Sequence, residues 1–206
     1  MPVDLRALVA PETTAVLTME VQRGVVGDLS TIPDLAREAE DCGLASSVGR
    51  LVSAGRVAGA TVVHCTAGFL PDNDGTPLNA PLIRAMLRRQ GHLLEGTPAV
   101  DVVAELGPSP GDVVSHRRHG VSPFGGTDLD VLLRGRGVST VIATGVSLNL
   151  GIPGLAIEAV NLGYSVVVPR DAVCGVPADY GQSILENMIR LVANVTTVDE
   201  VIACWA

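Results

Sequence analysis

The sequence predicts a doubly wound α/β fold, with a six-stranded, mostly parallel sheet between two layers of helices. Short apolar runs rich in Val, Ile and Thr recur along the chain, and unbroken runs of this kind are typical of strands buried on both faces. Segments with helical spacing of apolar residues separate the runs, and this alternation indicates a doubly wound sheet. Since the chain has 206 residues, of which 47% are hydrophobic, we expect residues 1–206 to form a single domain.

Six runs are assigned to strands, because each is short, β-branched and bounded by Gly, Pro or Asp. They are Ala15–Val21, Thr61–Cys65, Asp112–Ser115, Thr140–Thr144, Ser165–Val168 and a weaker sixth near Val195–Val198.

Five segments between the runs carry apolar residues at helical spacing. They are Asp34–Val57, Pro81–Arg89, Leu129–Arg134, Leu155–Leu162 and Tyr180–Val192. Asp34 and Thr127 have the residue types that begin helices, and Gly137 and Gly163 those that end them. The polar stretch Thr66–Asn79 predicts an exposed loop.

Composition excludes several classes of function. The net charge of −8 argues against nucleic acid and anionic membranes as partners. All 14 basic residues are Arg, so the chain has no lysine for a phosphate-binding P-loop or a Schiff base. No signal peptide is visible and no apolar run reaches the roughly 20 residues of a membrane span, so we expect a cytoplasmic protein.

Polar residues at the ends of the predicted strands are the candidates for a site, since open parallel sheets bind ligands there. Glu20 lies inside the first apolar run. Burial disfavours the ionised form of a carboxyl group, so an acid at this place suits general acid–base catalysis. The alternative is a structural ion pair with Arg117 or Arg118, which would keep Glu20 ionised.

Arginines, histidines and cysteines also follow the strands. Arg117 and Arg118 suit a substrate carboxylate, although arginines at strand ends are also common as solvated surface. The histidines lack metal-ligand spacing, so we expect no metal site and no cofactor. Cys65 and Cys174 fall near the expected site, where a lone cysteine is more often a small buried apolar residue than a nucleophile.

From about Ala15 to Ala172 the chain resembles the isochorismatase-like hydrolase superfamily, which includes nicotinamidases, related amidases and isochorismatases. Three segments in the expected order and spacing carry the resemblance. They are Glu20–Gln22 (Glu-Val-Gln), Ser122–Leu129 (Ser-Pro-Phe-Gly-Gly-Thr-Asp-Leu) and the series Gly145-Val146, Gly163-Tyr164 and Asp171-Ala172.

The family's catalytic pattern is an aspartate, a lysine and a cysteine, and the resemblance implies that all three are replaced here. Glu20 stands at the aspartate position, Arg118 at the lysine position and Gly151 at the cysteine position. Without that cysteine the thioester route of the amidases is closed. Isochorismatases also lack it and protonate a vinyl ether with the strand-one acid. The resemblance therefore implies a hydrolase that acts on a small anionic molecule, with Glu20 as general acid and Arg118 binding the anion.

The resemblance also implies substrate-binding residues, a backbone feature and an assembly. The substrate-binding residues are Gln22, Arg117, Phe124, Val146, Ser147 and Asn149. The Val146–Ser147 peptide is expected to be cis, and the protein to be a homo-oligomer with a small-molecule substrate.

Two alternatives stay open. Replacement at three catalytic positions fits a degenerate member that binds a small ligand or a protein partner without turnover. A cysteine at a new position, Cys65 or Cys174, would instead allow an amidase. The retained charge signs of Glu20 and Arg118 favour a maintained acid–arginine pair, either as a site or as a structural bridge.

Overall fold

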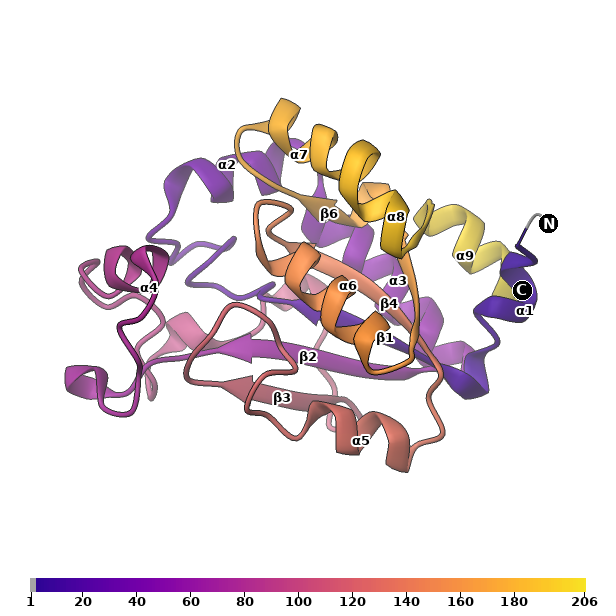
Figure 1. Cartoon of the computed structure of the whole chain (residues 1–206), viewed down its shortest axis with the longest axis horizontal. Helices are drawn as coiled ribbons and strands as arrows, with labels where there is room; N and C mark the ends of the chain where they lie inside the picture. The colour runs from indigo at the N-terminus through magenta and orange to yellow at the C-terminus, as the bar shows by residue number, and fades with distance from the viewer. Residues whose placement is uncertain (1–2) are drawn as a thin grey trace.

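A computed structural model describes residues 3–206 and shows a parallel sheet with strand order β3-β2-β1-β4-β5-β7 (Figure 1). The short strand β6 pairs with the end of β4. The strands are β1 (Thr14–Met19), β2 (Thr61–Ala67), β3 (Val113–Arg117), β4 (Thr140–Val146), β5 (Ser165–Pro169), β6 (Val173–Cys174) and β7 (Asn194–Thr196).

The doubly wound parallel sheet is confirmed, with one more strand than predicted. The described sheet has 7 strands, and the additional one, β6, has only 2 residues. A run this short leaves no apolar pattern in the sequence. The first strand also ends earlier than predicted, at Met19, because Glu20 adopts a left-handed backbone conformation and turns the chain out of the sheet.

Helices cover both faces of the sheet. Their bounds are α1 (Leu5–Leu8), α2 (Pro33–Asp41), α3 (Leu44–Ala58), α4 (Pro81–Met86), α5 (Leu129–Gly135), α6 (Gly151–Asn161), α7 (Ala178–Ile184), α8 (Arg190–Val192) and α9 (Val198–Trp205). One apolar cluster joins the sheet to α2, α3 and α9, and the other joins it to α5 and α6. Figure 1 shows α6 in front of the strands and α3 behind them, so the sheet is buried on both faces.

Several predicted segments differ from the observed elements. The helix predicted at Leu155–Leu162 begins at Gly151, and the helix predicted at Pro81–Arg89 ends at Met86. The helix expected at Asp34–Val57 is two helices, because Gly43 takes a left-handed φ of +66° between α2 and α3. The helix expected at Tyr180–Val192 contains a wider π-helical turn at Leu185–Ile189. The sixth predicted strand ends at Thr196, since Thr197 and Glu200 form a capping box that begins α9.

The loop predicted at Thr66–Asn79 begins two residues later than expected, since Thr66 and Ala67 belong to β2. A single 3₁₀ turn at Pro71–Asn73 interrupts it. Among residues 3–206, no helix is long and apolar enough to cross a bilayer.

A buried polar network fixes the start of β3 against its neighbours. The Thr18 hydroxyl lies 2.8 Å from His64 Nδ1, and His64 Nε2 lies 3.1 Å from Asp112 Oδ2. Arg56 on α3 donates two hydrogen bonds to the same carboxylate, at 3.0 and 2.6 Å. Burial raises the pKa of Asp112, but the hydrogen bonds from Arg56, the Ser109 amide and His64 outweigh it and hold the pKa below its ordinary value.

We expect Asp112→Asn to lower the free energy of unfolding by about 3 kcal/mol, because it leaves Arg56 without its anionic partner and His64 without a carboxylate. The pKa of Asp112 is lowered, so its stabilisation is present above the carboxyl's unfolded pKa and lost as the pH falls through the folded one. The variant should therefore lose less stability than the native protein below about pH 4. Urea unfolding at several pH values measures both effects.

The matched control is Asp199→Asn, which removes the exposed ion pair with Arg50. We expect a change within about 1 kcal/mol there. Equal effects of the two substitutions would show that the Asp112 network contributes no more than a surface ion pair.

Candidate active site

Glu20 follows β1 at the carboxyl edge of the sheet. Its φ is +50°, and its amide donates a 2.9 Å hydrogen bond to the carbonyl of Cys65. The neighbouring strand β4 approaches closely at Gly145, where an added Cβ would lie 2.2 Å from the Met19 carbonyl oxygen. The main chain therefore leaves the sheet at a defined point and places the Glu20 carboxyl group in the cavity at the strand ends.

Arg117 is the partner of Glu20. It is the last residue of β3, its side chain is 5% exposed, and its Nη2 donates to Glu20 Oε1. Because β2 lies between β1 and β3, the guanidinium reaches across the end of β2. Its Nε has no hydrogen-bond partner among the described residues. Both members of the ion pair line the cavity.

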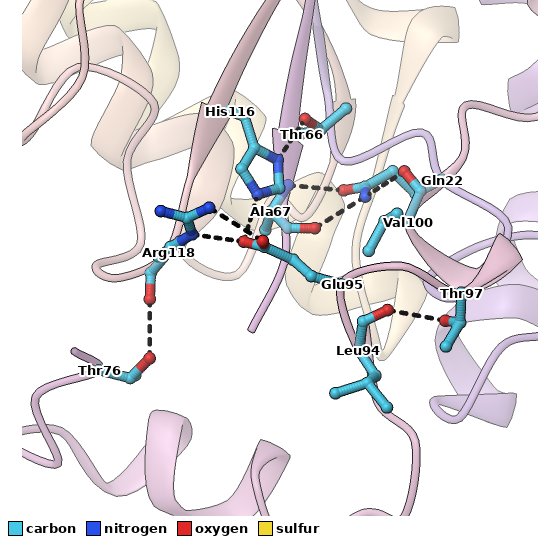
Figure 2. Close-up of polar contacts among 10 residues, drawn as sticks. All are labelled: Gln22, Thr66, Ala67, Thr76, Leu94, Glu95, Thr97, Val100, His116 and Arg118. Atoms are coloured by element: carbon cyan, nitrogen blue, oxygen red, sulfur yellow. Dashed lines mark hydrogen bonds and ion pairs between the residues drawn. The ribbon is translucent and has the colours of Figure 1, made fainter. Parts of the chain in front are cut away.

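Arg118 lies elsewhere, so the expected contact between Glu20 and Arg118 is corrected to Glu20 and Arg117. Arg118 donates from Nε and Nη2 to the Glu95 carboxylate, at 2.6 and 3.0 Å, and His116 Nε2 lies 3.0 Å from the same group (Figure 2). Side chains alternate between the faces of a strand, so His116 and Arg118 share one face and Arg117 takes the other. Arg118 holds the pKa of Glu95 at about 2.

The cavity beside Glu20 has a volume of about 60 Å³, which exceeds the roughly 10–15 Å³ that one water needs. Strand ends, the α2 and α4 helices and the loops between them form its wall. Its apolar lining residues are Ile32, Leu35, Ala67, Phe69, Leu82, Ile83, Met86, Leu93, Val121, Val146 and Leu150. Its polar lining side chains are Glu20, His92, Arg117, His119 and Ser147. The cavity therefore suits a small molecule with a mostly apolar body.

The end of β4 and the turn after it supply one wall of the cavity, which includes the candidate residues Val146, Ser147 and Gly151. The Val146–Ser147 peptide is cis, as the resemblance implied. Gly151 begins α6, and an added Cβ there would lie 2.9 Å from the Val146 carbonyl oxygen. The turn and the helix start thus approach too closely for a side chain at residue 151 unless one of them shifts.

Three residues predicted to bind substrate are absent from the cavity lining and have partners in the protein. Gln22 is fully buried, donates from Nε2 to the Ala67 and Val100 carbonyls and accepts from the Ala67 amide, each at 2.8 Å (Figure 2). Asn149 pairs with the backbone of Val176. Phe124 stacks on Tyr164 with ring centroids 6.0 Å apart. These side chains support the loops around the site.

Several lining residues were not predicted from the sequence. Phe69, His92 and His119 lie in loops, and Ile83 and Met86 lie on α4. Loop residues carry no periodic signal that would place them at the strand ends. Within residues 3–206, no group of three His, Cys, Asp or Glu side chains is arranged to hold a metal ion.

The comparisons with known proteins agree with this architecture. The family model described as isochorismatase domain matches residues 14–200. The chain belongs to the isochorismatase family. It is 26% identical over 195 residues to the uncharacterized isochorismatase family protein YecD of Escherichia coli O157:H7, covering 93% of this chain and 95% of the relative. It is 27% identical over 206 residues to the ureidoacrylate amidohydrolase RutB of Rhizobium rhizogenes, covering 92% and 82%.

Solved structures show the same fold. An isochorismatase family protein from Desulfovibrio vulgaris superposes with a TM-score of 0.77 at 26% identity, covering 93% of this chain and 98% of that chain. A cysteine hydrolase from Pseudomonas syringae gives a TM-score of 0.78 at 24% identity, covering 96% and 94%. These solved structures therefore share the fold of this chain.

Cys65 and Cys174 of this isochorismatase family member have environments that disfavour a thiolate. Burial raises the pKa of the Cys65 thiol to about 12. A hydrogen bond with Cys42 and burial together raise the pKa of Cys174. Neither Cys65 nor Cys174 is among the residues that line the cavity.

We expect Arg117→Met to lower the free energy of unfolding by about 3 kcal/mol, because it leaves the Glu20 carboxylate, 16% exposed, without a cation. Arg118→Met is the matched control, since its side chain is 52% exposed and its pair with Glu95 is partly solvated, and we expect a much smaller loss. Urea unfolding checks both. A larger loss in Arg118→Met than in Arg117→Met would contradict the assignment of the buried pair.

Proposed function

We propose that this isochorismatase family member is a hydrolase in which Glu20 transfers a proton to a small substrate bound in the cavity. One observation carries the proposal. Of the described residues that line the cavity, Glu20 alone has a carboxyl group, and its side chain is largely shielded from solvent. A positioned carboxyl group in a dry site is a usual general acid or base.

Vinyl-ether hydrolysis is the reaction that we favour. In it, the Glu20 carboxylate first takes up a proton from solvent and then adds it to the terminal alkene carbon. The oxygen of water adds to the carbon that bears the ether oxygen, and the proton released from that water returns to Glu20. The resulting hemiketal splits into an alcohol and a ketone, so one water is consumed and the acid is regenerated. No covalent bond to the protein forms, and a glycine at residue 151 is sufficient for this route.

The substrate that we propose has a mostly apolar body. An anionic substrate was expected because Arg118 was expected in the site, but Arg118 is bound to Glu95. The lining guanidinium, Arg117, is already paired with Glu20, so an anion would have to compete with that carboxylate. The apolar wall favours a compact molecule with few polar groups.

The second candidate function is ligand binding without turnover. The same ion pair favours it, because Arg117 and Glu20 satisfy each other in the unliganded cavity. A family member without catalytic activity would keep the Glu20–Arg117 ion pair for stability and bind a ligand in the cavity beside it. Saturable binding of a small molecule with no chemical change would identify this function.

We expect the purified protein to turn over at least one compound in a panel of small vinyl ethers and amides, with and without a carboxylate, followed by mass spectrometry. Because Glu20 supplies the proton, we expect Glu20→Gln to lower turnover of a vinyl ether by about 10²–10⁴-fold. Glu95→Gln is the matched control, because Glu95 also pairs with an arginine but is not among the lining residues, and it should retain near-native turnover.

Amide turnover that survives Glu20→Gln would contradict the general-acid mechanism. If no panel compound is turned over but one of them binds saturably, the ligand-binding function is favoured.

We expect iodoacetamide to leave turnover of the identified substrate unchanged, because Cys65 and Cys174 are buried and the pKa of each thiol is raised. Peptide mass spectrometry should locate the adduct at the exposed Cys42. Inactivation in step with alkylation of Cys65 or Cys174 would instead indicate a cysteine-based amidase.

A further inference from the structure

His92 lines the cavity, and its ring contains a buried nitrogen, Nε2, without a hydrogen-bond partner among the described residues. His92 is 4% exposed, and no described residue forms a hydrogen bond with this nitrogen. The ring lies against Phe69, with ring centroids 5.9 Å apart, and both residues line the cavity that holds Glu20. Buried polar groups in proteins are almost always paired, so an unpaired one in a cavity wall indicates a place for a bound group.

The contact with Thr31 favours a proton on Nε2, because Nδ1 is the acceptor that the Thr31 hydroxyl finds among the described residues. The Thr31 hydroxyl lies 2.7 Å from His92 Nδ1 and has no other hydrogen-bond partner among the described residues. A hydroxyl that donates to Nδ1 leaves the proton of a neutral imidazole on Nε2. Burial lowers the pKa of His92, which favours the neutral ring. The nitrogen without a partner is then an N–H donor.

We propose that the His92 Nε2–H donates a hydrogen bond to an oxygen acceptor of the bound molecule, so that the cavity selects small apolar molecules that carry an ether or carbonyl oxygen. The inference deepens the proposed function and rests on it through the shared cavity. His92 is the binding residue, and Thr31 is a positioning residue that acts through it.

The neighbourhood of His92 explains why an acceptor is selected. Leu93, Ile83, Met86 and Phe69 supply an apolar wall, which accommodates the body of the molecule but no polar group. A molecule without an acceptor leaves the N–H unpaired and desolvated, and leaving a buried donor unpaired is costly. We therefore expect selectivity for an acceptor of about tenfold.

The test uses cyclohexanone and methylenecyclohexane, which share a shape and differ in the carbonyl oxygen. Each is titrated into the ¹⁵N-labelled native protein and followed by NMR. We expect cyclohexanone to bind about tenfold more tightly, and its binding to shift the His92 Nε2 resonance. Long-range ¹H–¹⁵N spectra should show the Nε2–H tautomer before either probe is added.

Two substitutions of His92 separate the donor from the ring. His92→Phe keeps an aromatic ring beside Phe69 but has no donor, so the preference for cyclohexanone should vanish. His92→Gln restores an N–H donor of similar reach and should recover most of the preference. The NMR spectrum of each variant confirms that it is folded.

Thr31→Val tests the positioning role with the ring intact. We expect the ¹⁵N shifts of His92 to indicate a mixture of tautomers, and the preference for cyclohexanone to fall. An unchanged tautomer and an unchanged preference would overturn the assignment of Thr31.

Three results would overturn the proposal for His92. They are equal affinity of the native protein for both probes, no binding of cyclohexanone, or a preference that persists in His92→Phe. Binding is measured without turnover, so a clear preference for cyclohexanone in a protein that hydrolyses nothing would uphold the proposal for His92 and remove the proposed hydrolase activity.

Discussion

The ion pair between Glu20 and Arg117 is the constraint on which the rest of the site depends. Two opposite charges stand in a mostly apolar cavity, where either charge alone would be costly. Their contact requires that β1 end at Met19, that Glu20 turn out of the sheet and that β3 extend to Arg117. Gln22 holds the ends of the intervening segments together by binding the Ala67 and Val100 backbone. These hydrogen bonds thus hold the backbone in the arrangement that the ion pair requires.

The parallel sheet and its helices follow from patterns that a sequence displays directly. Runs of β-branched residues predicted β1 to β5, because strands buried on both faces need apolar residues at every position. The differences arise where a backbone conformation or a cap decides the outcome. Gly43 divides a segment whose apolar spacing is continuous, and the capping box at Thr197 begins α9 within a run that resembles a strand. Strand β6 is defined by its pairing with β4 and not by its own sequence.

The site could be predicted in part. Glu20, Val146, Ser147 and Gly151 line the cavity because strand ends and the turn after β4 follow from the chain order. Whether Arg117 or Arg118 faces Glu20 depends on strand alternation, which a one-residue difference reverses. Gln22, Asn149 and Phe124 have residue types that suit ligands, but each is satisfied by partners distant in the sequence. His92 reaches the cavity through a loop whose path no sequence pattern specifies.

The number of residues in β3 decides which side chain lies opposite Glu20 at the end of the strand. Among the described strands β3 is at an edge of the sheet, so β2 alone fixes its register. At the start of β3, Asp112 contacts His64. At its end, Arg117 binds Glu20 and Arg118 binds Glu95. Loss of one residue between these two ends would place Arg118 at the register position that Arg117 now holds, opposite Glu20. A relative with such a deletion would keep a folded sheet but present a different side chain to its ligand. Members of this fold can therefore diverge in ligand recognition through the length of a segment as well as through substitution.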